Sequence, residues 1–161
     1  MRDAFGGVLS LVLVTIFLVI VSGILALIVN YTKAFRMKNI VISAIEQYNG
    51  SPGCFGTGTS NANNSCRDKI EKGAAQIGYR PTELSCPTGY EMAYSDAGLF
   101  CYKGSDTGTG KTKNYVYSIV TQVDINIPII NKIMGLSIFQ VHGDTRPVEL
   151  IRSKIDKIKK N

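Results

Sequence analysis

Cysteine is the residue type with the clearest chemistry in this sequence. Thiolates bind zinc when they stand in C-x2-C clips, but eleven, nineteen and fourteen residues separate these cysteines and no clip occurs. An even number of cysteines in a small exported domain is instead typical of disulfide bonds. Neighbours along the chain suggest the pairs Cys54–Cys66 and Cys86–Cys101, although four cysteines allow three pairings. We therefore expect disulfides and no metal site.

The sequence offers little for acid–base or nucleophilic catalysis. His142 is the only histidine, and a Ser–His–Asp arrangement would have to use it with Asp144, two residues away. The chain contains no G-x-S-x-G turn, and its carboxylates are scattered. We expect His142 at the end of a strand and the protein to be no enzyme.

Residues 108–112, GTGKT, resemble part of a phosphate-binding loop. The full motif requires a glycine six positions before the lysine, where this chain has Ser105. It also requires a helix after the loop, so that backbone amides meet the phosphates, whereas a strand is expected here. We therefore expect a hairpin loop and no bound cofactor.

The elements that position these residues begin with a long apolar run. Residues 4–29 carry no charge, and about 20 apolar residues suffice for a helix to cross a bilayer. The core of a signal peptide has only about 7–15 residues, although small residues at 22, 23 and 26 leave cleavage open. A buried soluble helix is the other alternative, but so short a chain could hardly cover the run. We expect a transmembrane helix behind a stub of residues 1–3.

The charges beside this run conflict with the cysteines over topology. Lys33, Arg36 and Lys38 follow the run, whereas Arg2 and Asp3 precede it. The positive-inside rule would place the large domain in the cytoplasm, but disulfides form outside it. Large domains translocate largely regardless of charge, and the three cations could serve packing, so we favour the outside.

The helix is expected to continue beyond the membrane over residues 30–48. Apolar residues recur there at steps of three and four, with polar residues on the other faces. The sequence Asn49-Gly-Ser-Pro-Gly53 is a strong stop signal. The recurring residues are Ala34, Met37, Val41, Ala44 or Ile45, and Tyr48. One helix of about 45 residues, with one stripe toward a globular domain, is therefore predicted.

Residues 49–151 are expected to form an α+β domain with a small antiparallel sheet. The second half of the long helix is expected to pack on this sheet. The clearest strand is 115–127, where Tyr117, Ile119, Val123, Ile125 and Ile127 alternate with polar residues and predict one apolar and one polar face. The other expected elements are a surface loop at 54–66 lacking core residues, a helix at 65–77 with Ser65 as N-cap, a hairpin at 90–94 and 99–102, a loop at 104–110, a helical turn at 129–134, and strands at 136–141 and 148–151.

Aromatic and basic residues leave two interpretations open. The chain has eight tyrosines and no tryptophan, and core packing or a surface for sugars or partners would each explain them. Residues 152–161 form a basic tail that is either solvated or in contact with acidic lipid headgroups or nucleic acid. We expect solvation and no nucleic-acid partner. Six of the tyrosines gather in the sheet region: Tyr79, Tyr90, Tyr94, Tyr102, Tyr115 and Tyr117.

A membrane helix that continues into an exported, disulfide-stapled sheet domain resembles the architecture of type IV pilins. The start of the chain and the V-x-I-x-I-P pattern at 123–128 look more specifically like TadE-type pseudopilins of tight-adherence (Flp-type) pilus systems. In pilins the N-terminal helices bundle into a filament core. The resemblance therefore implies partners among other pilin-like subunits or assembly proteins.

The start of the chain departs from the pilin pattern. No basic leader precedes Phe5-Gly6-Gly7, and no acidic residue lies inside the run. Asp3, just before it, is the candidate for the acid that sets helix register, by neutralising a neighbour's terminal amine.

We therefore expect a structural, non-catalytic minor pilin-like or pilus/secretion-assembly component, anchored in the lipid bilayer with its domain outside the cytoplasm. The alternative is a single-pass membrane-anchored binding module that recognises a ligand or cell-wall component through its Tyr-rich sheet. A binding module would work without its apolar helix, whereas a filament component would need it.

Overall fold

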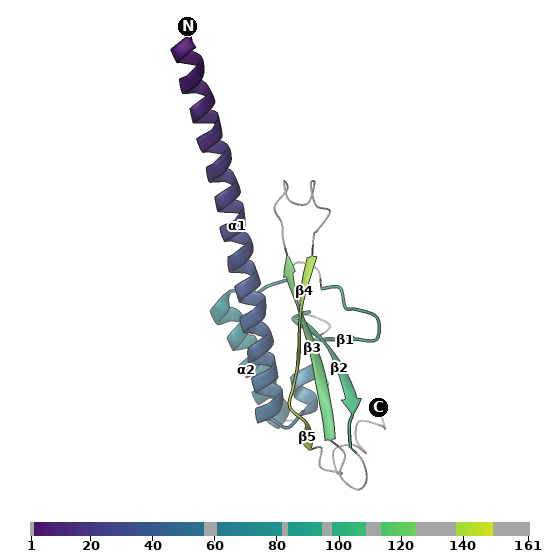
Figure 1. Cartoon of the computed structure of the whole chain (residues 1–161). Coiled ribbons are helices and arrows are strands. Elements are labelled where there is room, and N and C mark those ends of the chain that lie inside the picture. The colour runs from purple at the N-terminus through teal and green to yellow at the C-terminus, as the bar shows by residue number, and fades with distance from the viewer. Residues whose placement is uncertain are drawn as a thin grey trace.

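The computed structural model describes residues 2–56, 61–81, 84–94, 98–108, 114–124 and 138–149. Helix α1, Arg2–Gln47, extends far beyond the rest of the molecule, which we call the head (Figure 1). Its 46 residues span roughly 70 Å at 1.5 Å per residue. The predictions for residues 129–134 and 152–161 lie outside the described residues.

Helix α1 ends where the stop signal predicts, through a left-handed cap. Asn49 has a φ of 48° and Gly50 a φ of 63°. The N–H of Asn49 donates to the carbonyl of Glu46, and the N–H of Gly50 donates to that of Ile45 at 2.9 Å. These are the two bonds of a Schellman motif, which satisfies carbonyls that the end of a helix leaves without partners. The chain can then turn back toward the head.

The predicted stripe on the second half of α1 is confirmed. Each residue of the stripe up to position 45 is fully buried, and Tyr48 is partly buried against the same core. The stripe packs on the sheet, and helix α2, Asn61–Ile77, lies alongside α1 (Figure 1). The fully buried members are Ala34, Met37, Val41, Ala44 and Ile45.

Helix α2 begins earlier than predicted. Its first residue is Asn61, so Ser65 lies inside the helix and the prediction that it is the N-cap was wrong. The stretch from Asn61 to Ser65 contains neither glycine nor proline, and nothing in it stops a helix from extending by one more turn. At its other end, Gly78 adopts a φ of 62° and closes a second Schellman motif.

The prediction that residues 54–66 form only a surface loop was also wrong. Pro52–Phe55 form a short 3-10 helix, η1, and Phe55 is only 7% exposed. Its ring centroid lies 4.4 Å from that of Tyr102 and 4.8 Å from that of Tyr117. An isolated aromatic residue among glycines and threonines shows no periodicity, so its place in the core could not be read from a pattern.

The sheet is an antiparallel meander in the order β1-β2-β3-β4, with β5 also paired to β3. Two strand boundaries differ from the prediction. Strand β2 continues to Asp106 through residues that were expected to form a loop, and β4 extends past His142, which lies within the strand opposite Val120. The strands are β1 Glu91–Ala93, β2 Phe100–Asp106, β3 Asn114–Asp124, β4 Ile138–Asp144 and β5 Val148–Glu149.

The two faces of β3 are less different than the alternating pattern predicts. Tyr117, Ile119 and Val123 are buried in the core beside α1, as expected. Gln122 was expected on a polar face, but it is 2% exposed, and its side-chain oxygen accepts a bond from the Ser85 N–H at 2.9 Å. The Cys86–Cys101 disulfide holds the segment that contains Ser85 to strand β2 of the sheet. Ile125 and Ile127 lie outside the described residues.

Candidate functional site

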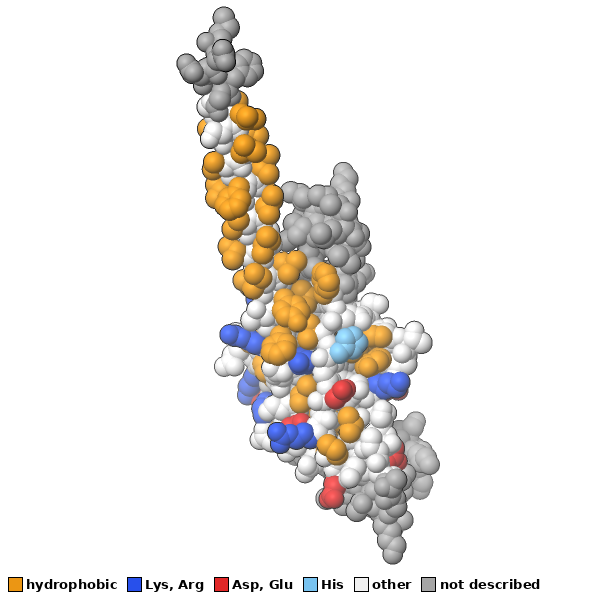
Figure 2. Space-filling view, in the orientation of Figure 1, with side chains coloured by type: hydrophobic (Ala, Val, Ile, Leu, Met, Phe, Trp, Pro, Cys, Tyr) orange, Lys and Arg blue, Asp and Glu red, His pale blue; other side chains and the backbone are white. Residues whose placement is uncertain are grey.

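The most exposed apolar surface is the first half of α1, residues 7–29, which we call the shaft. Most of its large side chains are about half exposed or more, from Val8 at 65% to Val29 at 53%. Figure 2 shows hydrophobic side chains along this part of the helix, with the charged side chains of this face lying below it. An apolar surface of this size on one molecule marks contact with a membrane or with other proteins.

Two hydroxyl side chains of the shaft are satisfied within the helix. The hydroxyl of Thr15 donates to the carbonyl of Val12 at 2.8 Å, and that of Ser22 donates to the carbonyl of Val19 at 2.9 Å. Lipid offers no partner for a polar group, so internal bonds of this kind are what a helix in hydrocarbon requires.

Within the described part of the chain, one helix is long and apolar enough to cross a membrane, and it is α1. No part of its most apolar window is buried inside the molecule. A buried soluble helix would need other parts of the protein to cover it, and the described residues do not cover this one. The surface remains available to lipid or to neighbouring helices.

Two of the three basic residues that follow the run contact the head. The ammonium of Lys38 lies 4.2 Å from the ring centroid of Phe35, and its methylenes lie against Gly143 of β4. Lys33 lies beside the last turn of α2, where a Cβ on Gly78 would be 3.7 Å from its Nζ. A cation at the C-terminal end of a helix is favourable, because carbonyls without partners point outward there. These contacts explain why two lysines follow the apolar run, and a cytoplasmic location is not needed to explain them.

The four cysteines form the two disulfides that neighbouring positions suggested, Cys54–Cys66 and Cys86–Cys101. The first joins the 3-10 helix η1 to α2, and both of its cysteines are fully buried. The second joins the segment before β1 to the first residues of β2. Both bonds therefore lie in the head, and extracytoplasmic compartments favour such bonds.

The candidate residues for catalysis do not form a triad. The Ser118 hydroxyl donates directly to Asp144 Oδ1 at 2.6 Å. His142 is exposed on the same strand as Asp144, and its ring centroid lies 6.4 Å from that of Tyr90, edge to face. In a triad the imidazole stands between hydroxyl and carboxylate, and here it does not. Among the described residues, no group of three or more His, Cys, Asp and Glu could hold a metal ion.

Two other predicted features are only partly described. Asp3 lies in the first turn of α1, and its side chain lies outside the described residues. Of the GTGKT sequence, Gly108 alone is described, and its N–H donates to Asp106 Oδ1 at 3.0 Å. Ser105, at the position where the motif needs glycine, lies in β2 opposite Val116.

The tyrosines mostly serve the core, as one of the two interpretations expected. Tyr79, Tyr94 and Tyr117 are at most 8% exposed. The Tyr94 hydroxyl donates to the carbonyl of Gly53 at 3.0 Å, and that of Tyr102 donates to Glu91 at 2.7 Å. Burial raises the pKa of the Tyr94 and Tyr102 phenols well above the ordinary value of 10.0, and the bond to Glu91 raises that of Tyr102 further. Both hydroxyls are therefore bonded to other groups of the protein.

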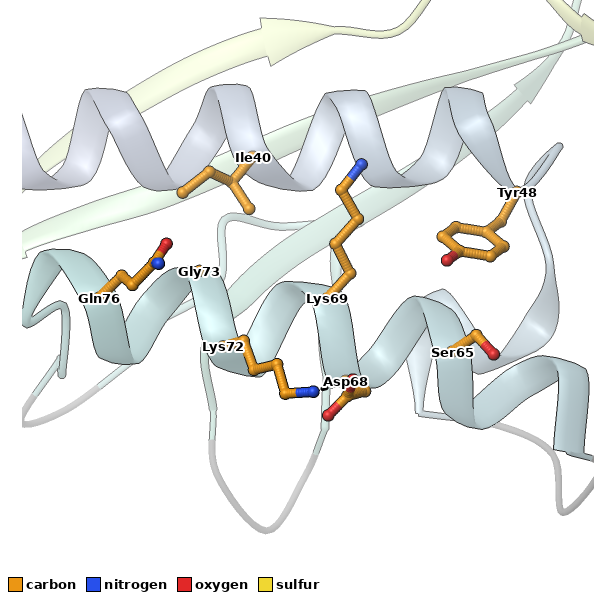
Figure 3. A pocket seen from close by; sticks show the side chains of 8 residues that line it. All are labelled: Ile40, Tyr48, Ser65, Asp68, Lys69, Lys72, Gly73 and Gln76. Carbon is orange, nitrogen blue, oxygen red and sulfur yellow. Dashed lines mark hydrogen bonds and ion pairs between the residues drawn. The ribbon is translucent and has the colours of Figure 1, made fainter.

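A groove of about 600 Å³ between α1 and α2 was not predicted (Figure 3). The side chain of Lys69 donates to that of Gln47 across it, and Lys72 forms an ion pair with Asp68 at 2.7 Å. The ammonium groups of Lys69 and Lys72 are thus bound by other side chains of the protein. The groove is lined by Ile40, Tyr48, Ser65, Asp68, Lys69, Lys72, Gly73 and Gln76. Gly73 inside a helix was the only sequence signal for the close approach of the two helices.

No family model, curated protein or solved structure matches this chain. The chain is therefore characterised by its own geometry: an exposed apolar shaft on a disulfide-stapled α+β head.

Proposed function

We propose that this protein is a structural, non-catalytic subunit, a minor pilin-like or pilus/secretion-assembly component that the shaft anchors in a membrane. The observation that carries the proposal is the continuity of α1. The same helix is exposed at Leu13 and Phe17 and fully buried at Met37 and Val41. A simple tether would tolerate a flexible linker between membrane and head. An unbroken helix instead determines how the head is placed relative to anything that packs on the shaft.

The disulfides support a head outside the cytoplasm. Cytoplasmic thiols are kept reduced, whereas both bonds here are formed. The basic residues after the run are the argument against this orientation, and the packing of Lys33 and Lys38 on the head weakens it. The proposed partners are the lipid bilayer and other subunits with apolar helices.

The proposal is tested by photo-crosslinking of the full-length chain in the membranes of cells that produce it natively. A photoreactive residue at Phe17, 64% exposed on the shaft, should give products that contain a second copy of this chain or another single-helix subunit. The matched control is the same photoreactive residue at Met92, 41% exposed on the head. Mass spectrometry identifies the crosslinked chains.

Products at position 17 that contain only lipid, with the chain monomeric after gentle solubilisation, would overturn the assembly proposal. Products at position 92 alone would favour the binding module, whose contacts are made by the head.

A further inference from the structure

We propose that the end of the head nearest the shaft, together with the adjoining turns of α1, is a lipid-contact surface that seats the head on an anionic membrane. The surface consists of Tyr31 and Phe35 on α1 and Phe139 on β4, flanked by the exposed Arg36. We call it the seat. The inference rests on the membrane-anchoring part of the proposed function and does not depend on assembly.

Three aromatic side chains of the seat are exposed, whereas the other described aromatic residues of the head are buried or partly buried. Tyr31 is 49%, Phe35 43% and Phe139 40% exposed. Tyr31 and Phe35 are four residues apart on α1 and therefore share one face of the helix. Rings that remain this exposed, Phe35 even with the Lys38 ammonium over its ring, favour a partner that tolerates apolar surface.

Hydrogen bonds and register place Phe139 within one helical turn of Tyr31 along α1. Arg146 donates its N–H to Glu46, and Gly143 lies against Lys38, so lower residue numbers on β4 lie nearer the shaft. Thr121 is bonded to Ala34 and stands opposite Val141. Phe139 lies two residues further toward the shaft, about 7 Å along the strand. This distance corresponds to between four and five residues of helix, which leads from Ala34 to the height of Val29 or Asn30, within one turn of Tyr31.

The seat begins directly where the apolar run ends. Val29 is the last residue of that run, and Phe35 lies six residues beyond it, roughly 9 Å along the helix axis. With a hydrocarbon core of about 30 Å and headgroup layers that bring the bilayer to about 40–45 Å, this depth falls within or just beyond the headgroups. Tyr is enriched at that depth because its ring is apolar and its hydroxyl is polar, which fits Tyr31, and the apolar Phe35 and Phe139 rings beside it would face the hydrocarbon side of the interface. Figure 2 shows hydrophobic side chains continuing from the shaft onto the head beside Lys and Arg side chains.

The charges around the seat favour anionic lipid. Arg36 and the lysines at 33 and 38 all lie within one turn of Phe35, and no acidic residue occurs between Asp3 and Glu46. Cations on a membrane-facing surface attract acidic headgroups. A second copy of the chain would present the same cations at the same height, and like charges would oppose that contact. Lipid is therefore the occupant that the observations favour.

The absence of tryptophan from this chain allows a direct test. Single variants of the full-length protein, Phe139→Trp, Phe35→Trp and Phe17→Trp, are reconstituted in vesicles of anionic lipid, and emission is quenched by lipids brominated at known depths along the acyl chain. The control is Tyr115→Trp, at the other end of β3, where the strand pairs with β5. The disulfides of each variant are mapped first, to confirm that the head has folded.

The Phe139→Trp and Phe35→Trp variants should be quenched more by lipids brominated near the headgroup than by lipids brominated deeper in the chain, whereas the Tyr115→Trp control should be unaffected. Adding Arg36→Gln to the Phe139→Trp variant should reduce its quenching in anionic vesicles and leave it unchanged in neutral ones. Equal quenching in anionic and neutral vesicles would overturn the role of the cations.

Quenching of the Phe17→Trp variant, without quenching of the variants at positions 139 and 35, would overturn the seat and leave the anchor intact. If the Phe17→Trp variant is also unquenched, the anchor itself fails. An emission shift of the Phe139→Trp variant that follows protein density in the membrane and does not respond to bromine would show that a second copy covers the surface. That result would likewise overturn the lipid assignment.

Discussion

The hydroxyl of Thr121 donates a hydrogen bond to the carbonyl oxygen of Ala34 at 3.0 Å, although 87 residues separate them in the chain. Both residues are fully buried. The bond joins the middle of β3 to the first buried residue of the α1 stripe, and thereby sets the height at which the head is held on the helix. The position of the shaft relative to the head depends on this contact and on the apolar packing below it.

Replacing Thr121 with Val should lower the free energy of unfolding of the head by about 1 kcal/mol, because the substitution keeps the shape and removes one buried hydrogen bond. The Ala34 carbonyl loses a donor, but no large cavity forms. Chemical denaturation in detergent followed by circular dichroism measures the change. Thr107→Val, at an exposed threonine on a loop, is the control. Equal effects of the two substitutions would show that the buried bond contributes no more than the exposed bond from Thr107 to Asn114.

Gly73→Ala should destabilise the head although alanine is the better helix former. A Cβ at this position would lie 2.7 Å from Ile40 Cγ2, which is attached directly to a branched carbon and cannot swing away freely. The cost of overpacking, about 1–3 kcal/mol, exceeds the gain in helix propensity of about 1 kcal/mol. Adding Ile40→Ala should restore much of the loss, and a double-mutant cycle measures this coupling. Additive effects would mean that α2 does not rest on Ile40.

The two disulfides should differ in their resistance to reduction. Cys54, Cys66 and Cys101 are fully buried, whereas Cys86 is only half-buried. A mild reductant should therefore open Cys86–Cys101 first, because thiol exchange requires access to a sulfur. Alkylation of the folded protein followed by mass mapping gives the order. Simultaneous opening of both bonds would show that reduction requires global unfolding.

Removing either bond by paired Cys→Ser substitution should lower stability by about 2–4 kcal/mol, since each closes a loop of similar length in the unfolded chain. Denaturation of the two double variants, compared with the parent, checks this value. A loss confined to one variant would show that the other bond adds no stability beyond the packing around it.

Alkaline pH should unfold the head by ionising tyrosines. The folded pKa values of Tyr94 and Tyr102 are raised above the ordinary 10.0, chiefly by burial. The stability they contribute is fully present below about pH 10, the unfolded value, and is lost as the pH rises above it. Phenolate absorbance should therefore show a late phase that coincides with loss of structure. In Tyr94→Phe, neutral-pH stability should fall by about 1 kcal/mol, because the bond to Gly53 is lost, and the late phase should shrink. A late phase of unchanged size would contradict the assignment to Tyr94.

Local patterns were sufficient to predict the long helix, its end and its buried stripe. Met37, Val41 and Ile45 follow helical periodicity, and Asn49-Gly50 is a stop signal that works through the conformation of the residues themselves. The neighbouring cysteines paired as their short separations suggested. In each case the interactions that cause the feature join residues close together in the chain, and for this reason the sequence alone was enough to predict it.

The tertiary structure decided what no local pattern contains. Phe55 enters the core because two tyrosine rings from β2 and β3 meet it there. Gly104, Ser105 and Asp106 have low strand propensity, yet β3 supplies the ladder that keeps them extended. Gln122 is buried because the Cys86–Cys101 bond draws another segment over it. The exposed shaft was visible in the sequence from the start, but the height of the head upon it follows from contacts such as Thr121 to Ala34, between residues far apart in the chain.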